Sequence, residues 1–122
     1  MQIIEVPGLP ANNTTYSQAV RMGGLVYVSG QLGMVPGEGR LAEGGIAAQT
    51  KQAIENLGRI LDAAGSSLQR VGKVNIYITD FRLLAEMNVV FAQYFPQRPA
   101  KTTVEITALD RGALIEIEVI AE

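Results

Sequence analysis

The chain has 122 residues, a formal net charge of −2, and a composition that is 48% hydrophobic and 18% charged, which is typical of a single folded domain spanning 1–122. It has no histidine and no cysteine, which excludes Ser-His-Asp and Cys-His nucleophiles, the usual zinc sites and internal disulfide bonds. No basic run indicates a nucleic-acid partner, and no apolar run approaches the roughly 20 residues that span a membrane. The first residues lack the pattern of a signal peptide, so we expect a cytoplasmic protein.

The first half of the chain predicts three strands followed by a helix. The expected strands cover 2–6, 16–22 and 25–28. Gly23-Gly24 is a two-residue hairpin signal, because both glycines tolerate positive φ. The glycine-rich segment 37–45 matches neither a phosphate-binding loop nor a dinucleotide fingerprint, and we interpret it as a flexible loop that could act as a lid. A helical apolar period over 46–64 predicts a helix that ends at Gly65.

The second half predicts a strand, a second helix and two further strands. Alternation predicts a strand over 74–79, and Asp80 can then cap a helix whose apolar stripe extends over 84–94. The remaining segments are expected to form a strand over 102–107, a turn over 109–112 and a strand over 113–121. This order predicts an α+β fold in which two helices cover only one face of a sheet.

The last predicted strand has two different faces. One face carries Ile115, Ile117 and Val119, and the other carries Leu114, Glu116, Glu118 and Ile120. The second face is partly apolar and partly acidic, so neither a simple core nor plain solvent suits it. We therefore expect another subunit to cover part of it and to leave a polar cleft near the glutamates.

Lys101 and Glu116 form the first candidate constellation. Pairing of the last two strands through the 109–112 turn would let these side chains approach across the sheet or across an interface. A cation beside a carboxylate could hold an anionic substrate and transfer a proton. The alternative, a structural ion pair or two solvated surface charges, is the one that spacing alone favours.

Other polar residues carry weaker signals. Tyr16 and Tyr77 could donate hydrogen bonds or stack on a planar ligand, although aromatic residues on strands more often serve packing. Gly30, within Ser29-Gly30-Gln31, could let a ligand approach the backbone or simply form a turn. Asn88 lies beside the apolar stripe of the second helix and could equally be a half-exposed polar residue.

Six segments share their order and spacing with the motifs of one known family. They are 16–20 (YSQAV), 28–31 (VSGQ), 49–57 (QTKQAIENL), 73–80 (KVNIYITD), 99–106 (PAKTTVEI) and 115–121 (IEIEVIA). They resemble the signatures PYSQAV, SGQ, QTxQAxxN, KxxVYxxD, PARxxVEV and IEIEAIA. From about Val6 to its end, the chain thus resembles the RidA (YjgF) family of reactive-imine deaminases, also described as endoribonuclease L-PSP.

The resemblance implies a fold, an assembly and a reaction. The fold is chorismate-mutase-like, with a mixed sheet and two helices on one face. The assembly is a homotrimer with the sheets facing inward and clefts between subunits. The reaction is hydrolysis of small enamines or imines, such as 2-aminoacrylate and 2-iminopropanoate, to a 2-keto acid and ammonia. No metal and no organic cofactor is implied.

The resemblance also implies roles for individual residues. The implied cleft residues are Tyr16, Ser29, Gly30 and Asn88 for substrate binding, Glu116 for positioning water or moving a proton, and Thr103 at the position of the family's cysteine. Lys101 stands where the family's enzymes carry an arginine that binds the substrate carboxylate through two hydrogen bonds. A lysine supplies only a point charge, and the loss of one such bond would weaken binding by roughly 1–3 kcal/mol. Arg98 is a candidate substitute.

Three functions therefore stay open. The leading hypothesis is an imine or enamine hydrolase of altered specificity, with Lys101 binding the carboxylate and Glu116 activating water. The second is a non-enzymatic trimer that binds keto acids or other small carboxylates. The third is ribonuclease or translation-inhibitor activity, against which the charge of −2 and the absence of histidine weigh.

Overall fold

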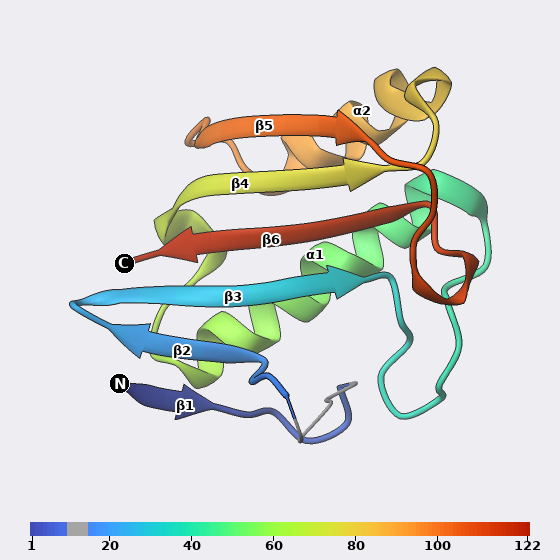
Figure 1. The fold of residues 1–122 in the computed structure, drawn as a ribbon. Coiled ribbons are helices and arrows are strands. Elements are labelled where there is room, and N and C mark those ends of the chain that lie inside the picture. The colour runs from blue at the N-terminus through green and yellow to red at the C-terminus, as the bar shows by residue number, and fades with distance from the viewer. Residues whose placement is uncertain (10–14) are drawn as a thin grey trace.

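The computed structural model describes residues 1–9 and 15–122, and these residues form a six-stranded sheet with two α-helices (Figure 1). The strands are β1 (Gln2–Ile4), β2 (Ala19–Met22), β3 (Leu25–Leu32), β4 (Val71–Ile78), β5 (Ala100–Glu105) and β6 (Ile115–Ala121). The helices are α1 (Gly45–Ala63) and α2 (Leu84–Tyr94), with short 3-10 turns at Leu68–Arg70, Phe81–Leu83 and Asp110–Gly112. The expected α+β class is confirmed.

The strands are ordered β1-β2-β3-β6-β4-β5 across the sheet. Neighbours pair antiparallel except at one edge, where β5 pairs parallel with β4. The pairing of the last two strands, which was the condition for Lys101 and Glu116 to approach each other across the sheet, does not occur, because β6 inserts between β3 and β4. Alternate residues of β6 are fully buried, which suits a central strand, whereas β5 is exposed along most of its length, which suits an edge.

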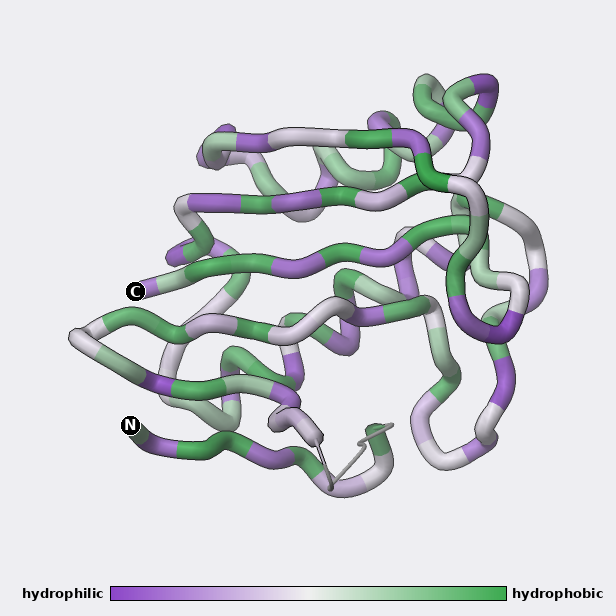
Figure 2. The backbone as a smooth tube through the Cα atoms, in the orientation of Figure 1, coloured by the Kyte–Doolittle hydropathy of each residue, from purple (hydrophilic) through white to green (hydrophobic). Residues whose placement is uncertain are grey.

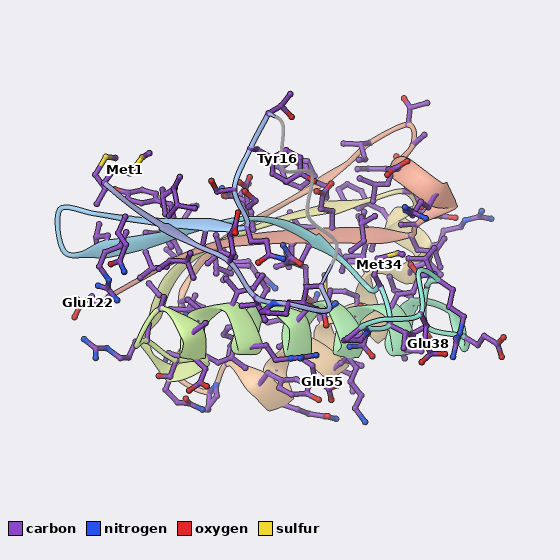
Figure 3. The ribbon with its side chains drawn as sticks, turned by 90° about the horizontal axis from the view of Figure 1, so that it is seen from below. Met1, Tyr16, Met34, Glu38, Glu55 and Glu122 are labelled. Atoms are coloured by element: carbon purple, nitrogen blue, oxygen red, sulfur yellow. The ribbon has the colours of Figure 1, made fainter. Side chains whose placement is uncertain are left out.

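Both helices lie against the same face of the sheet, as expected (Figures 1 and 3). Ile115, Ile117 and Val119 point into the core beneath α1 and are at most 2% exposed. Glu116 and Glu118 alternate with them and are half-buried on the opposite side, which we call the open face. This alternation is visible along β6 in Figure 2 and confirms the predicted division of the last strand.

The ends of α1 and α2 follow the sequence signals. Gly65 adopts a φ of 78°, and the amide of Ser66 donates to the carbonyl of Leu61 at 2.8 Å, so the chain reverses immediately after α1. Asp80 accepts a hydrogen bond from the amide of Arg82 at 2.8 Å and thereby caps the 3-10 turn that leads into α2. The predicted end of α1 is confirmed, whereas Asp80 caps the 3-10 turn and α2 itself begins at Leu84 without a side-chain cap.

Strand boundaries near the site differ from the prediction. β2 begins at Ala19, so Tyr16 precedes the strand instead of lying within it. β3 continues to Leu32, and its pairing with β6 shifts register between Val28 and Gln31. Ser29 and Gly30 therefore form a bulge inside a strand and not its end, which the local pattern of the sequence does not distinguish.

The glycine-rich connection after β3 has a defined form. The amide of Val35 donates to the carbonyl of Arg40, and that of Ala42 to the carbonyl of Gly33, each at 2.8 Å. Asn56 of α1, which is fully buried, donates from Nδ2 to the carbonyl of Met34 at 2.8 Å. These bonds give the segment interpreted as a flexible loop a hairpin-like shape, and a lid role stays a prediction.

Candidate functional site

Glu116 lies on the open face directly above the β3 bulge. A β-carbon at position 30 would lie 2.7 Å from Cδ of Glu116 and closer still to its Oε1, so only glycine leaves room for the side chain in this position. Beside it is a shallow pocket of about 300 Å³. The pocket is lined by Gly30, Tyr77, Ile106, Leu109, Glu116 and Glu118. The sequence-predicted residues Gly30 and Glu116 are therefore brought together.

The environment of Glu116 favours its protonated form. Burial raises the pKa of this carboxyl, and the negative charges of Glu118 and Asp110 raise it further. Glu118 accepts a hydrogen bond from the hydroxyl of Tyr77, and this bond raises the pKa of Tyr77. Within the described part of the chain, Glu116 itself has no hydrogen-bond or ion-pair partner. A half-buried carboxyl with a raised pKa and no internal partner can accept a proton from a substrate or from water.

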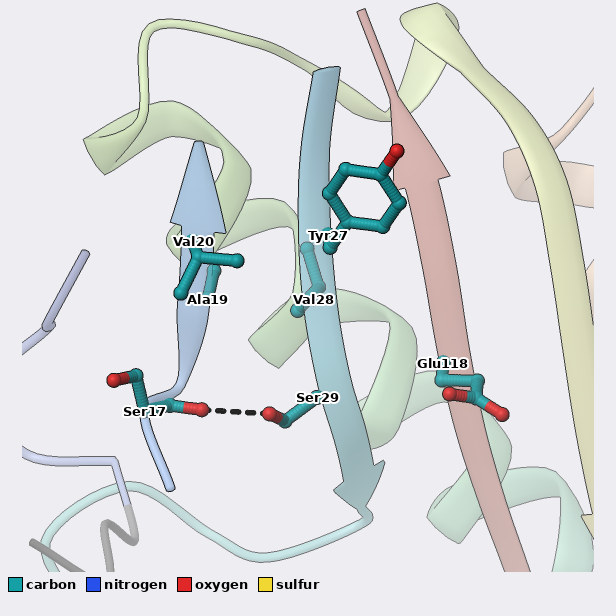
Figure 4. Close-up of a pocket in the computed structure, with 7 residues that line it drawn as sticks. All are labelled: Ser17, Ala19, Val20, Tyr27, Val28, Ser29 and Glu118. Carbon is teal, nitrogen blue, oxygen red and sulfur yellow. Dashed lines mark hydrogen bonds between the residues drawn. The ribbon is translucent and has the colours of Figure 1, made fainter. Parts of the chain in front are cut away.

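Ser29 borders a second hollow on the open face, of about 260 Å³. Its hydroxyl donates to the carbonyl of Ser17 at 2.6 Å, so the side chain is held toward β2 (Figure 4). Tyr27 and Glu118 line the same hollow from neighbouring strands. Tyr16 is 55% exposed and lies on the side of the sheet away from the helices (Figure 3).

Lys101 lies on the other face of the sheet. It pairs in register with Val74, whose side chain is in the core, whereas Glu116 pairs with Tyr77 on the open face. The two candidate residues therefore do not approach each other across the sheet of one chain. The two residues also lie on strands that are not neighbours, because β4 lies between β6 and β5.

The side chain of Lys101 turns toward α2. Its Nζ donates to Oδ1 of Asn88 at 2.8 Å and lies 4.6 Å from the centroid of the Phe91 ring. Partial burial lowers the pKa of Lys101. The structure thus brings Lys101 together with Asn88, and adds Phe91, which the sequence indicated only as part of the apolar stripe of this helix.

Two other predicted residues lie near Lys101 on the chain. Thr103 is half-buried on β5 on the same face as Lys101, in register with Ile76 of β4. Arg98 is exposed, and its backbone adopts a φ of 57° in the turn before β5. No hydrogen bond or ion pair within the described residues directs its guanidinium toward Glu116.

Sequence reasoning gave no site role to several residues that shape these surfaces. Glu118 lines both hollows, and its place on the acidic face of the last strand was the available signal. Gln49 of α1 accepts a hydrogen bond from the amide of Leu114 at 2.9 Å, two residues before Glu116. Gln49 lies in the segment 49–57, which resembles a family signature, but that resemblance does not indicate which group Gln49 contacts.

The described residues contain neither a metal-ligand cluster nor a membrane-spanning helix. No cluster of three or more His, Cys, Asp or Glu side chains in residues 1–9 and 15–122 could hold a metal ion. Over the same described residues, neither helix has the length and apolar character needed to cross a membrane.

Comparison with known proteins finds full-length relatives. Residues 8–122 match the family model described as Endoribonuclease L-PSP. The 2-iminobutanoate/2-iminopropanoate deaminase of Bos taurus is 41% identical over 121 residues, covering 98% of this chain and 88% of that protein. A RutC family protein of Pyrococcus horikoshii is 40% identical over 121 residues, covering 98% of this chain and 96% of that protein. The crystal structure of RidA from the Antarctic bacterium Psychrobacter sp. matches with a TM-score of 0.92 and 43% identity, covering 99% of this chain and 98% of that one.

Proposed function

This chain belongs to the RidA/YjgF family, also described as endoribonuclease L-PSP, and on that premise we propose that it hydrolyses small 2-imino acids and their enamine tautomers to 2-keto acids and ammonia. A relative that is 41% identical is named for the 2-imino acids 2-iminobutanoate and 2-iminopropanoate. The observation that carries the proposal is Glu116, a half-buried carboxyl with a raised pKa at the wall of a pocket of about 300 Å³.

Glu116 acts as the general base in this proposal. It removes a proton from a water molecule while the water oxygen attacks the carbon of the protonated imine, giving a tetrahedral carbinolamine. It gives that proton to the nitrogen and then accepts the hydroxyl proton as the carbon–nitrogen bond breaks, the carbonyl forms and ammonia leaves. The last proton passes to ammonia, which is released as ammonium and leaves Glu116 ionised again. One water is consumed for each keto acid and ammonia produced. A raised pKa suits both steps, because the same group must accept and then donate a proton near neutral pH.

Lys101 binds the substrate carboxylate in this proposal. Within the described residues it forms no ion pair with any carboxylate, so its charge is available to a ligand. Its position on the face opposite Glu116 requires that a shared site take Lys101 from one copy of the chain and Glu116 from another. Lys101 lies on the edge strand β5, where a second copy can approach it.

We propose a homotrimer as the assembly that creates such sites. The open face exposes large apolar side chains at the end away from Glu116, with Met1, Ile3 and Met22 at 83%, 55% and 52% exposure. Val20, Tyr27 and Ile120 lie beside them in the paired strands. An apolar area of this kind on a sheet face is typical of a surface that another subunit covers. Light scattering that finds a monomer at micromolar concentration would remove this part of the proposal.

Mixing two inactive variants tests whether the site is shared. Lys101→Met and Glu116→Gln should each be inactive as homotrimers. After denaturation and refolding of an equal mixture, random trimers would contain wild-type pairs at about a quarter of their sites, and about a quarter of the activity should return. A refolded mixture without activity, beside fully active refolded wild type, would contradict a site built from two copies.

The reaction is tested by ammonia release from 2-iminopropanoate generated by an auxiliary enzyme. The purified protein should accelerate release, and Glu116→Gln should abolish the acceleration. Lys101→Arg should retain it, because a guanidinium keeps the charge and adds a second hydrogen bond. If neither the wild type nor Lys101→Arg accelerates release, the proposed hydrolase is wrong.

Two alternatives are outcomes of the same measurements. Binding of 2-oxobutanoate without turnover would assign the chain to carboxylate sensing through Lys101. Ribonuclease activity is disfavoured by the pocket itself, because Glu116 and Glu118 both line it and would repel a phosphate backbone. RNA cleavage that survives stringent purification and disappears in Glu116→Ala would reverse that assignment.

A further inference from the structure

Lys101 does not project freely from the edge of the sheet. Its ammonium is held against α2, 2.8 Å from the amide oxygen of Asn88 and 4.6 Å from the centroid of the Phe91 ring. Asn88 and Phe91 are three residues apart in a helix, so they occupy the same helix face one turn apart. The amide oxygen and the ring thus contact the same ammonium from one surface of α2.

The Phe91 ring is itself held in place. It is 6% exposed and stacks on Phe95, with ring centroids 4.4 Å apart and an interplanar angle of 22°. A fixed ring face attracts a cation within about 6 Å of its centroid. Phe91 therefore presents a stationary attractive surface to the end of a flexible side chain.

We propose that Phe91, together with Asn88, is the positioning element that orients the Lys101 ammonium for the ligand carboxylate. This inference rests on the proposed function and adds to it a residue that positions Lys101 so that a lysine can bind the ligand carboxylate. We call Asn88 and Phe91 the Lys101 seat. An arginine would present a rigid, planar fork, whereas a lysine has a flexible four-carbon stem and must be oriented by its neighbours.

The seat leaves the ammonium able to bind a ligand. One of its three N–H groups is directed to Asn88, and two are left for the oxygens of a carboxylate. The amide oxygen and the ring face both attract positive charge. The seat therefore favours a charged anchor over a neutral amine that would attack a carbonyl.

The test combines a local signal with ligand binding. In protein labelled with ¹³C-lysine, the ε-methylene protons of Lys101 should be shifted upfield by the Phe91 ring and identified by their loss in Lys101→Arg. Phe91→Met removes the ring but keeps an apolar side chain, Phe91→Tyr keeps a ring face, and Phe95→Met is the matched control for loss of a buried aromatic ring. Each variant is titrated with 2-oxobutanoate and assayed for ammonia release.

We expect Phe91→Met to lose the upfield shift and to raise Kd and KM about three- to tenfold, with kcat changed less than about twofold. Phe91→Tyr should restore the shift and the affinity, whereas Phe95→Met should lower Tm and weaken both less than Phe91→Met does, because it loosens the Phe91 ring without removing it. Absence of the shift in the wild type, or equal Kd in Phe91→Met and Phe95→Met, would overturn the inference. If the wild type shows the shift but neither binds 2-oxobutanoate nor releases ammonia, the proposed function fails, and the seat is a packing contact only.

Discussion

Gly30 and Glu116 occupy adjoining strands so closely that the side chain of Glu116 lies where a β-carbon of residue 30 would be. The contact forms where β3 bulges between Val28 and Gln31 in its pairing with the neighbouring strand β6. The atoms that a β-carbon would meet are Cγ, Cδ and Oε1 of Glu116, all in the movable part of that side chain. Residue 30 therefore controls where the carboxylate is, and has less influence on whether the sheet forms.

Gly30→Ala should lower activity strongly while leaving stability nearly unchanged. Displacement of a catalytic group by about 1 Å can cost roughly a hundredfold in rate, and we expect a loss of kcat/KM of about ten- to a hundredfold. Ammonia release and thermal unfolding measure the two effects. Gly72→Ala is the matched control, because Gly72 is also on a strand and a β-carbon there would meet nothing within 4 Å. Equal activity in the two variants would contradict the role assigned to Gly30.

Gly33→Ala should have the opposite result. A β-carbon at residue 33 would lie 2.6 Å from the carbonyl oxygen of Gln49, and that oxygen belongs to the backbone of α1 and cannot rotate away. Overpacking against a backbone should lower the free energy of unfolding by about 1–3 kcal/mol. Urea denaturation, again with Gly72→Ala as the control, measures the loss. If Gly33→Ala were as stable as Gly72→Ala, α1 would be able to move away from the added β-carbon without loss of stability.

Local sequence patterns predict much of this fold. The alternation along 115–121 correctly divides β6 between the core and the open face, because strand side chains alternate with a period of two. Local patterns do not predict the strand order, because it depends on pairing between segments that are distant in the sequence. A strand, a helix and a strand follow one another over β4, α2 and β5, and this pattern is typical of a parallel crossover. This pattern indicates β4 as the partner of β5, but the short turn at 109–112 suggested pairing between β5 and β6 instead.

The candidate site is only partly predictable for the same reason. Glu116 and Gly30 are indicated by local pattern and by family resemblance, and the bulge brings them together. The face that Lys101 occupies depends on its register with Val74, which no local pattern gives. The contact between Lys101 and Phe91 depends in addition on how α2 packs against the edge of the sheet.

Asn56→Ala should destabilise the connection after β3. Asn56 is fully buried, and its Nδ2 donates to the carbonyls of Met34 at 2.8 Å and Leu32 at 3.4 Å. Removal of the amide leaves buried carbonyls unsatisfied, and we expect a loss of about 1–3 kcal/mol in the free energy of unfolding. Gln52→Ala, which removes only the half-buried donor to Asn56, should cost less. Urea denaturation of both variants checks the order, and equal losses would contradict it.

Glu116→Gln should stabilise the fold at neutral pH. The pKa of Glu116 is raised in the folded protein, so the folded state binds a proton more tightly than the unfolded chain does. The free energy of unfolding therefore falls as pH rises from below the pKa of this carboxyl in the unfolded chain to above its pKa in the folded protein. Gln carries no such cost, and its Tm should exceed that of the wild type at pH 7 and approach it at pH 4. A difference that grows toward pH 4 would contradict this sign.

Glu118→Gln should shift the pH dependence of the reaction. The base must be ionised, so the rate rises with pH through the pKa of Glu116, and the charge of Glu118 contributes to keeping that pKa high. Gln removes this charge but keeps an acceptor for the hydroxyl of Tyr77, so the acid limb of the kcat/KM profile should move to lower pH. Asp110→Asn should move it in the same direction by less, because Asp110 contributes the smaller of the two charge effects. An acid limb that stays in place in both variants would show that Glu116 is not the group whose ionisation limits the rate.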